Sequence, residues 1–153
     1  MTVRVQREDF DTAAELERLS TGNPRIGAVV TFTGLVRDFA AEQPGTTPQS
    51  MTLEHYPGMT ERQLGDILAE AESRWPLEAA LIIHRYGELA PGDRIVLVVT
   101  ASAHRQAAFE ANAFLIDWLK TKAPFWKLEQ AGGERRWVEA KTSDDTAAAR
   151  WQR

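Results

Sequence analysis

The sequence SAHRQAAFEANAFLIDWLKTKAPFWK, residues 102–127, decides how this chain is organised. It reads as one long helix that begins after a small hydroxyl residue, Ser102, and ends near Pro124. The middle of this stretch is mostly apolar, as expected for a helix packed into a core. Its basic side chains gather at the two ends, with His104 and Arg105 at the front and Lys120, Lys122 and Lys127 at the back.

The flanking segments predict alternating strands and helices. The almost continuous apolar run at 94–101 predicts a central strand. Other strands are expected at 3–7, 26–36, 50–56 and 78–86, and as a hairpin at 125–129 and 135–139. Further helices are expected from Asp11 to Leu19 and from Thr60, with Gln63 completing a capping box, to Trp75. The segment 87–93 reads as a broad turn and 40–49 as a loop.

This order mixes hairpins with crossovers and contains no internal repeat. It predicts an α+β fold with a mixed, largely antiparallel sheet and three main helices. The length, 153 residues, is that of a single domain spanning 1–153. Its polar end, 142–153, is expected to be either a short helix or a flexible tail.

Composition excludes several classes of function. The formal charge of −4 argues against general nucleic-acid binding, so any anion site must be a local basic cluster. Because there is no cysteine, the chain has no disulfide, thiolate metal site or cysteine nucleophile. No stretch resembles a signal peptide or a membrane span, so we expect a cytoplasmic protein.

The front of the long helix carries charge of the wrong sign for stability. A helix start exposes unpaired N–H groups and a partial positive charge, which acidic side chains would complement. Arg105 and a protonatable His104 instead add positive charge there. A bound anion would correct this mismatch. The alternative, that Arg105 is simply solvated and His104 is an ordinary polar residue, stays open.

The back of the helix has two readings as well. Lys120 and Lys122 lie where cations favour the helix dipole, so they can be a solvated cap. Lys127, however, follows closely after the helix and can fold back beside Lys120. Two neighbouring lysines against apolar walls lower each other's pKa, which suits proton transfer or nucleophilic chemistry near neutral pH.

Arg37, at the exit of the strand at 26–36, is either a surface charge or a second anion clamp. His55, His84 and His104 lack the spacing of metal ligands, so no metal site is expected. No phosphate-binding loop, serine elbow or carboxylate pair stands out. These residues alone therefore predict an anion-binding α+β domain.

Six motifs add a resemblance to a known family. They occur in the order VTFTGLVR (30–37), LEHYPGMT (53–60), IHRYGEL (83–89), SAHR (102–105), LKTKAPFWK (119–127) and RWVEA (136–140). Over residues 25–151 the chain closely resembles the large, catalytic subunit of molybdopterin synthase. The ordered set is far more specific than any single motif.

The resemblance implies a fold, a reaction and partners. The fold would be of the α/β-hammerhead type with added antiparallel strands. The reaction would be sulfur transfer to cyclic pyranopterin monophosphate, forming the dithiolene of molybdopterin. The sulfur would arrive as a thiocarboxylate on the C-terminal Gly-Gly of a small ubiquitin-like subunit. Two large subunits would form a homodimer within a heterotetramer, and no cofactor would be needed.

The resemblance also implies site residues. Lys120 and Lys127 match the catalytic lysines, which we assign to acid–base chemistry and to substrate positioning, respectively. Arg37, His104 and Arg105 match the anion-binding positions and would hold the substrate phosphate. Lys141 stands where the family often has arginine, so a contact from that position would lose its bidentate geometry. The long helix would then hold both ends of one pocket in place.

Two other functions remain possible on this sequence. The first is a non-catalytic module of the same fold that binds a phosphorylated ligand or a partner's tail. The second is a phosphate-ester hydrolase that uses the same anion pocket and needs no sulfur donor.

Overall fold

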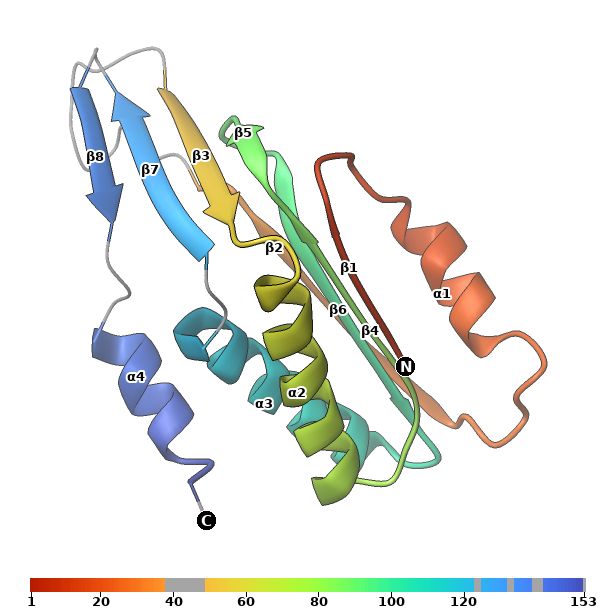
Figure 1. Cartoon of the computed structure of the whole chain (residues 1–153). Coiled ribbons are helices and arrows are strands. Elements are labelled where there is room, and N and C mark those ends of the chain that lie inside the picture. The colour runs from red at the N-terminus through yellow and green to blue at the C-terminus, as the bar shows by residue number, and fades with distance from the viewer. Residues whose placement is uncertain (38–48, 123–124, 132–133, 139–141, 153) are drawn as a thin grey trace.

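The computed structural model describes residues 1–37, 49–122, 125–131, 134–138 and 142–152. The predicted loop at 40–49 and Lys141 therefore lie outside the described residues, apart from Gln49. The elements alternate much as the sequence predicts (Figure 1). The strands are β1 (Thr2–Gln6), β2 (Ala28–Leu35), β3 (Gln49–His55), β4 (Leu77–Arg85), β5 (Gly87–Leu89), β6 (Arg94–Ser102), β7 (Phe125–Ala131) and β8 (Glu134–Val138). The helices are α1 (Thr12–Ser20), α2 (Met59–Arg74), α3 (Arg105–Lys122) and α4 (Thr142–Ala149).

The strands form two sheets, each with four strands. Sheet A has the order β1-β4-β6-β2, and sheet B has the order β5-β3-β7-β8. Only the β1–β4 pair is parallel, and every other pair among the described strands is antiparallel. The predicted α+β class with a largely antiparallel arrangement is therefore confirmed. The central position of β6, between β4 and β2, is confirmed too.

Short strand β5 corrects the sequence prediction of a broad turn at 87–93. Gly87, with φ of 96°, follows Tyr86 and redirects the chain from β4 in sheet A to β5 in sheet B. Met51 and Leu53 of β3 pair opposite Leu89 and Gly87, and the buried side chains of Met51, Leu53 and Leu89 share one cluster. A three-residue strand with one apolar contact to bury is too short to give a period-2 signal in the sequence.

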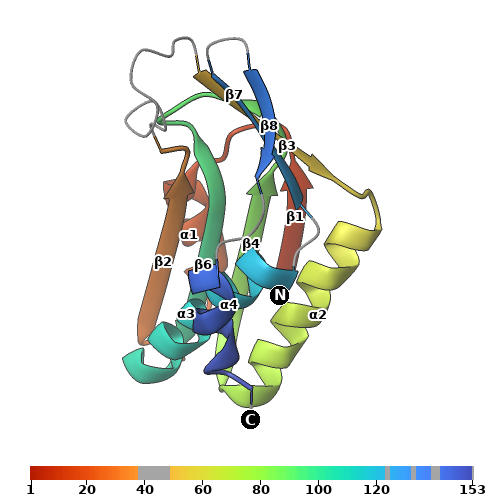
Figure 2. The same ribbon diagram turned by 90° about the vertical axis from the view of Figure 1, so that its left-hand side faces the viewer.

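Sheet A carries helices on both faces. Helices α2 and α3 cover one face, with α4 packed on α3, whereas α1 covers the other face (Figures 1 and 2). The larger core lies under α2 and α3 and contains Leu64, Ile82, Val98, Phe114 and Leu115, all essentially without exposure. The smaller core lies under α1. The alternation of β4 divides its side chains between the two, so Ile82 faces α2 and α3 while Leu81 and Ile83 face α1.

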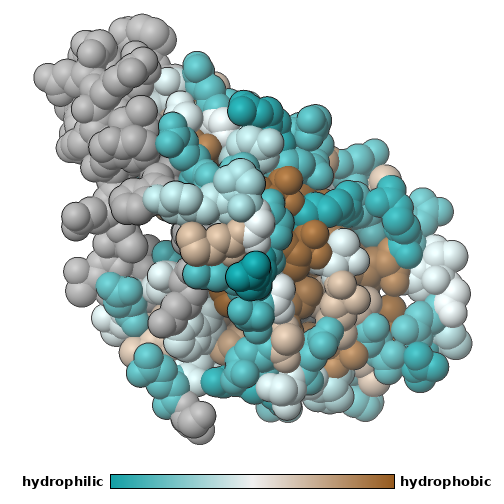
Figure 3. Space-filling view, in the orientation of Figure 1, coloured by the Kyte–Doolittle hydropathy of each residue, from teal (hydrophilic) through white to brown (hydrophobic). Residues whose placement is uncertain are grey.

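Edge strand β1 closes the sheet on the side between α2 and α1. Val3 and Val5 are half-buried and pack against the larger core. In the space-filling view, apolar residues gather between these two helices within an otherwise hydrophilic surface (Figure 3).

Helix α1 begins as predicted, since Asp11 is its N-cap and its Oδ1 accepts from the Ala14 N–H at 3.1 Å. Helix α2 begins one residue earlier than predicted. Its capping interaction joins Gly58 and Glu61, whose carboxylate accepts from the Gly58 N–H at 2.6 Å. The predicted box of Thr60 and Gln63 is wrong, because Thr60 is buried and its hydroxyl accepts from the Tyr56 N–H.

Helix α3 is shorter than the predicted stretch of 102–127. Ser102 still belongs to β6, and its buried hydroxyl donates to the Pro76 carbonyl at 2.7 Å instead of capping the helix. The helix ends at Lys122, and Phe125 already starts β7. Proline at 124 explains this end, since it disfavours helical backbone in the residue before it.

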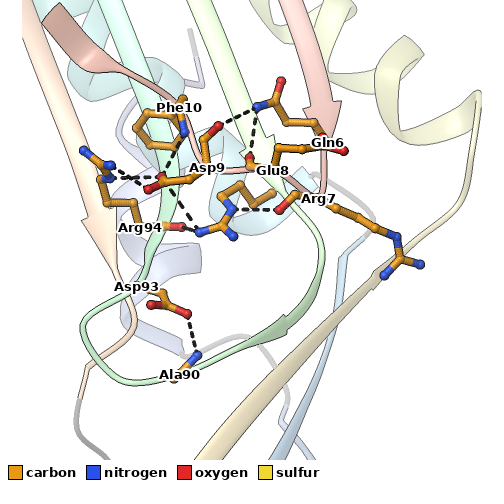
Figure 4. Close-up of polar contacts among 9 residues, drawn as sticks. Gln6, Arg7, Glu8, Asp9, Phe10, Ala90, Asp93 and Arg94 are labelled. Atoms are coloured by element: carbon orange, nitrogen blue, oxygen red, sulfur yellow. Dashed lines mark hydrogen bonds and ion pairs between the residues drawn. The ribbon is translucent and has the colours of Figure 1, made fainter.

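A charged network ties the segment after β1 to the start of β6 (Figure 4). The Arg94 guanidinium donates to both carboxylate oxygens of Asp9, at 3.0 and 2.6 Å. These bonds, above all, hold the pKa of Asp9 below its usual value. Arg85 donates to the carbonyls of Arg7 and Arg94 and so fixes the same corner of the sheet.

The C-terminal segment begins with helix α4 and is anchored on α3. Ala148 is buried, and the Trp151 Nε1–H donates to Asp117 at 2.7 Å. Arg74 of α2 donates to the Trp151 carbonyl at 2.6 Å. Of the two readings of this segment, the structure has the short helix.

Gly27 marks a point where two backbones meet, just before β2. A Cβ at this position would lie 2.3 Å from the Ala103 carbonyl oxygen, which belongs to the link between β6 and α3. We expect Gly27→Ala to lower the free energy of unfolding by about 2 kcal/mol, because backbone must move to relieve the overlap. Urea unfolding followed by circular dichroism measures this loss.

The matched control is Gly65→Ala in α2, where nothing lies within 4 Å of the added carbon. That change should stabilise the protein by about 0.5–1 kcal/mol through helix propensity. Equal effects of the two substitutions would contradict the close approach at Gly27.

Candidate active site

Helix α3 runs back along sheet A, and this direction decides where its ends lie. The Thr100 hydroxyl donates to the Ala108 carbonyl, and one turn later Asn112 Nδ2 lies 3.1 Å from the Val98 and Val30 carbonyls. Along these contacts the residue numbers rise in α3 and fall in β6, so the helix runs antiparallel to the strand. Lys120 therefore lies toward the Arg94 end of β6, far from Ser102.

His104 and Arg105 lie at the opposite end of α3 from Lys120. Both side chains are exposed, and the first turn of α3 contains no acidic residue. At 1.5 Å per residue, Arg105 and Lys120 are separated by about 22 Å along the helix axis. The expectation that one helix holds both ends of one pocket is therefore wrong within a single chain.

Arg37 lies at the same end of the sheet as Lys120. It follows β2, whose last residue Leu35 pairs opposite Arg94, and its side chain is exposed. Lys127 is described through its backbone alone, which lies opposite Leu53 in β3, two residues after Phe125. The structure thus brings Arg37, Lys120 and the Lys127 backbone toward one end of the molecule and leaves His104 and Arg105 at the other.

A cluster of rings fills the junction of the two sheets beside Lys120. His84, near the end of β4, stacks on Phe125 with ring centroids 3.7 Å apart and planes 17° apart. His55, at the end of β3, lies 4.1 Å from the Tyr86 ring and 6.5 Å from Phe125. We call these four residues, His55, His84, Tyr86 and Phe125, the junction cluster.

Charged groups border the junction cluster on several sides. The Arg7 guanidinium lies over the Tyr86 ring, with Cζ 4.8 Å from the ring centroid, and points away from the Asp9 network (Figure 4). Glu61 of α2 places a carboxylate oxygen 3.8 Å from His55 Nε2. Lys120 of α3 is exposed, and its charge acts on His84.

His84 is a buried, neutral histidine. Burial lowers the pKa of its imidazole to about 4, the hydrogen bond with the Arg85 carbonyl opposes this, and the charges of Lys120 and His55 lower it further. Its Nδ1 lies 2.8 Å from the Arg85 carbonyl oxygen. A carbonyl only accepts, so Nδ1 carries the proton and Nε2 keeps its lone pair.

Sequence reasoning missed the junction cluster. It considered His55 and His84 only as metal ligands, and among the described residues no group of His, Asp and Glu could hold a metal ion. A usable signal was present. His84 has the same parity in β4 as the core residues Ala80 and Ile82, so a polar ring had to point into the α2–α3 side of the sheet.

The described part of the chain also has a cavity of about 680 Å³ between α2, α3 and the C-terminal segment. Ile67, Phe114 and Trp118 form its apolar wall, and Asp66 and Glu70 lie at its rim. Among the lining residues that the structure describes the one cation is Arg74, which is already paired with Glu70 at 2.9 Å. None of the predicted site residues whose side chains the structure describes, Arg37, His104, Arg105 and Lys120, lines it, and its described rim is unsuited to a phosphate.

No helix among the described residues is long and apolar enough to cross a membrane.

Solved structures first define the class of protein. A molybdopterin biosynthesis MoaE protein from Burkholderia ambifaria superposes with a TM-score of 0.83 at 48% identity, covering 99% of both chains. A molybdopterin synthase from Staphylococcus aureus superposes with a TM-score of 0.79 at 32% identity, covering 89% of this chain and 96% of that one. The fold is thus the one found in this MoaE protein and in this molybdopterin synthase.

Sequence comparisons then identify the family. The family model described as MoaE protein matches residues 5–122. A molybdopterin synthase catalytic subunit from Mesorhizobium japonicum is 56% identical, covering 99% of this chain and 93% of its own length. One from Pseudomonas aeruginosa is 55% identical, covering 99% of both. This chain belongs to the MoaE family, and the resemblance found in its motifs is confirmed.

Burial of His84 predicts a pH dependence of stability. An unfolded histidine takes up its proton near pH 6.5, whereas His84 in the folded protein does so near pH 4. The free energy of unfolding therefore decreases as pH falls from 6.5 to 4, by at most roughly 3 kcal/mol. Above pH 6.5 His84 causes no such decrease. We expect His84→Phe to lose this part of the pH dependence, measured by urea unfolding at pH 7.5 and 4.5.

The informative quantity is the difference in unfolding free energy between His84→Phe and the wild type at each pH. It should shift in favour of the variant at pH 4.5, since other groups titrate alike in both proteins. A difference that stays constant between the two pH values would show that His84 is not held neutral.

Proposed function

We propose that this chain is the catalytic subunit of a molybdopterin synthase. It transfers sulfur from the C-terminal thiocarboxylate of a small ubiquitin-like subunit to cyclic pyranopterin monophosphate, and it forms the dithiolene of molybdopterin. What carries the proposal is the agreement between the family match and the position of Lys120, which is exposed and close enough to the junction cluster for its charge to act on His84. The cytoplasm is the proposed compartment, because the chain has no cysteine that would require oxidising conditions.

The sulfur must come from a partner in this proposal. A chain without cysteine has no thiol on which to carry sulfur, so its part is to bind the donor and the acceptor and to promote the transfer between them. Lys120 is the proposed acid–base group, and Lys127 is proposed to position the substrate and stabilise developing charge. Neither a metal nor an organic cofactor enters this scheme.

The substrate's phosphate is proposed to lie among Arg37, His104, Arg105 and Lys141. His104 and Arg105 cannot reach a substrate at Lys120 of their own chain, because of the roughly 22 Å between them. A second copy of the chain can supply them to the site. We therefore propose a homodimer whose two sites each combine Lys120 of one copy with His104 and Arg105 of the other, inside the heterotetramer.

The surface of β2 supports a second copy as its neighbour. β2 is an edge strand of sheet A, and it exposes Val29 and Leu35 at 41% and 55%. Phe109, one turn after Arg105 in α3, is 61% exposed. Exposed edges and large apolar side chains are usually covered in the functional assembly.

The first test is Lys120→Ala in the complete complex. Conversion of the precursor should fall by about 100-fold or more, as expected when a general acid–base group is removed. Affinity for the small subunit should change by less than about threefold, since only one exposed side chain is removed. A coupled assay of dithiolene formation and calorimetric titration of the small subunit give the two numbers.

Lys120→Arg is the matched control, because arginine keeps the charge and cannot give up its proton near neutral pH. If Lys120 transfers protons, this variant stays as inactive as Lys120→Ala. Near wild-type conversion in Lys120→Ala would contradict the catalytic assignment of Lys120, and a wild-type complex that binds its ligands without converting the precursor would favour the non-catalytic binding module. Phosphate release from the precursor without any sulfur donor would favour the hydrolase.

The second test concerns the composite site. Lys120→Ala and Arg105→Ala should each lower conversion, by about 100-fold and at least about tenfold respectively. Chains of the two variants are unfolded, mixed in equal amounts and refolded together. Half of the resulting dimers are mixed, and each mixed dimer has one intact site, so conversion should recover to about a quarter of the wild-type value.

Variants refolded separately and then combined without exchange serve as the control and should stay at or below about a twentieth of the wild-type value. No recovery in the refolded mixture, with mixed dimers demonstrated by mass spectrometry, would contradict a site shared between two copies.

A further inference from the structure

The stack of His84 on Phe125 connects sheet A to sheet B. The proposed reaction needs these two sheets in a fixed position relative to each other. His84 belongs to β4 of sheet A, and Phe125 is the first residue of β7 in sheet B. Their ring centroids are 3.7 Å apart, with an angle of 17° between the planes. Helix α3 ends at Lys122, and Phe125, the first residue after it that the structure describes, is held by sheet A at this contact.

Phe125 lies between the two proposed catalytic lysines in sequence, five residues after Lys120 and two before Lys127. Lys120 is set by the packing of α3, whereas Lys127 is set by β7 through its register with Leu53. The backbone of Phe125 is held on one side by its pairing with His55. Its ring is held by His84.

His84 is itself firmly held. It is 5% exposed, and its Nδ1–H donates to the Arg85 carbonyl, which fixes the orientation of the ring. Its backbone lies in the interior of sheet A, where it pairs with Val5 of β1 on one side and with Val96 of β6 on the other. A buried ring with one polar edge fixed can position a neighbour without moving itself.

The neutral state of this ring matters for its neighbours. Several groups around His84 bear charge or can take it up: Lys120 of α3, His55 of β3, Glu61 of α2 beside His55, and Arg7 after β1 over Tyr86. A protonated His84 would add a second cation beside Lys120 inside the protein. Burial prevents this at neutral pH, so the ring positions Phe125 without opposing the charge of Lys120.

We propose that His84 is a positioning residue for the sulfur-transfer site, acting through Phe125 to fix the start of β7 and with it the placement of Lys127 relative to Lys120. This inference rests on the proposed function for its effect on catalysis. The anchoring of β7 by the stack stands on geometry alone. A misplacement of about 1 Å between reacting groups commonly costs about 100-fold in rate.

Two substitutions distinguish the contribution of the His84 ring from that of its hydrogen bond. His84→Asn keeps a donor for the Arg85 carbonyl and removes the stacked ring, whereas His84→Phe keeps a ring and removes the donor. In the assembled complex, His84→Asn should lower kcat about 10- to 100-fold with little change in KM for the precursor. His84→Phe should stay within about threefold of wild type.

Phe125→Leu removes the ring from the other side of the contact and should reproduce His84→Asn. It also keeps the test decisive if His84→Asn fails to fold. Wild-type kcat in either His84→Asn or Phe125→Leu would overturn the proposal, as would equal losses in His84→Asn and His84→Phe.

Hydrogen exchange provides a readout that does not depend on sulfur transfer. The amides of β7 should exchange at least about tenfold faster in His84→Asn and Phe125→Leu, and at the wild-type rate in His84→Phe. Exchange in α1, on the other face of sheet A, is the internal control and should be unchanged. Unchanged exchange in β7 would overturn the anchoring.

Proximity of Lys120 to His84 is tested in the same samples by NMR titration of the His84 ring. Lys120→Ala should raise the pKa of His84, because the neighbouring positive charge disappears. Arg18→Ala, in α1 on the other face of sheet A, also removes one positive charge and should not change it. If wild-type complex fails to convert the precursor, the proposed function fails while exchange and titration still decide the anchoring.

Discussion

The packing of α3 against β6 and β2 is the contact on which the rest of the structure depends. Its buried face includes Ala108, Ala111, Phe114 and Leu115, and small residues at the first two positions let the helix approach the sheet closely. Asn112 fixes how the helix is placed in this apolar contact, because its Nδ2 lies 3.1 Å from carbonyls of both β6 and β2. A buried amide without these partners would cost free energy, so the helix is fixed in register as well as in position.

This packing separates the two ends of α3 and gives them different surroundings. The front end, with His104 and Arg105, is open to solvent beside an exposed sheet edge. The back end reaches the junction where β4 of sheet A continues into β5 of sheet B. There the buried His84 ring, the start of β7 and the charge of Lys120 come together. The proposed homodimer follows from this separation, since the proposed chemistry needs both kinds of end at one substrate.

Much of the fold could be predicted from local patterns. The apolar run of β6 and the Asp11 cap of α1 were predicted and are confirmed. The failures share a cause, which is tertiary context. Thr60 has the chemistry of a cap and is instead buried against Tyr56, and Ser102 bonds across to Pro76. The division into two sheets is decided by Gly87 and a three-residue strand, too little sequence to carry a pattern.

The candidate site, too, could be predicted from the sequence only in part. Lys120, His104 and Arg105 were singled out because charge at helix ends is visible in sequence, but which ends meet is a matter of assembly. The junction cluster was missed because three of its members come from three different strands and the fourth, Tyr86, follows β4. Only the alternation of β4 hinted that His84 faces the same side of sheet A as α2 and α3.

The most direct measurement of where the reaction occurs is a crystal structure of the assembled complex with cyclic pyranopterin monophosphate bound. Two places in the described chain compete for it: the end of α3 beside the junction cluster, and the cavity of about 680 Å³ lined by Phe114 and Trp118. Density for the pterin within hydrogen-bond distance of Lys120, with its phosphate near His104 and Arg105 of the second copy, is the predicted result. Density in the cavity between α2 and α3, or a substrate that never approaches Lys120, would contradict it.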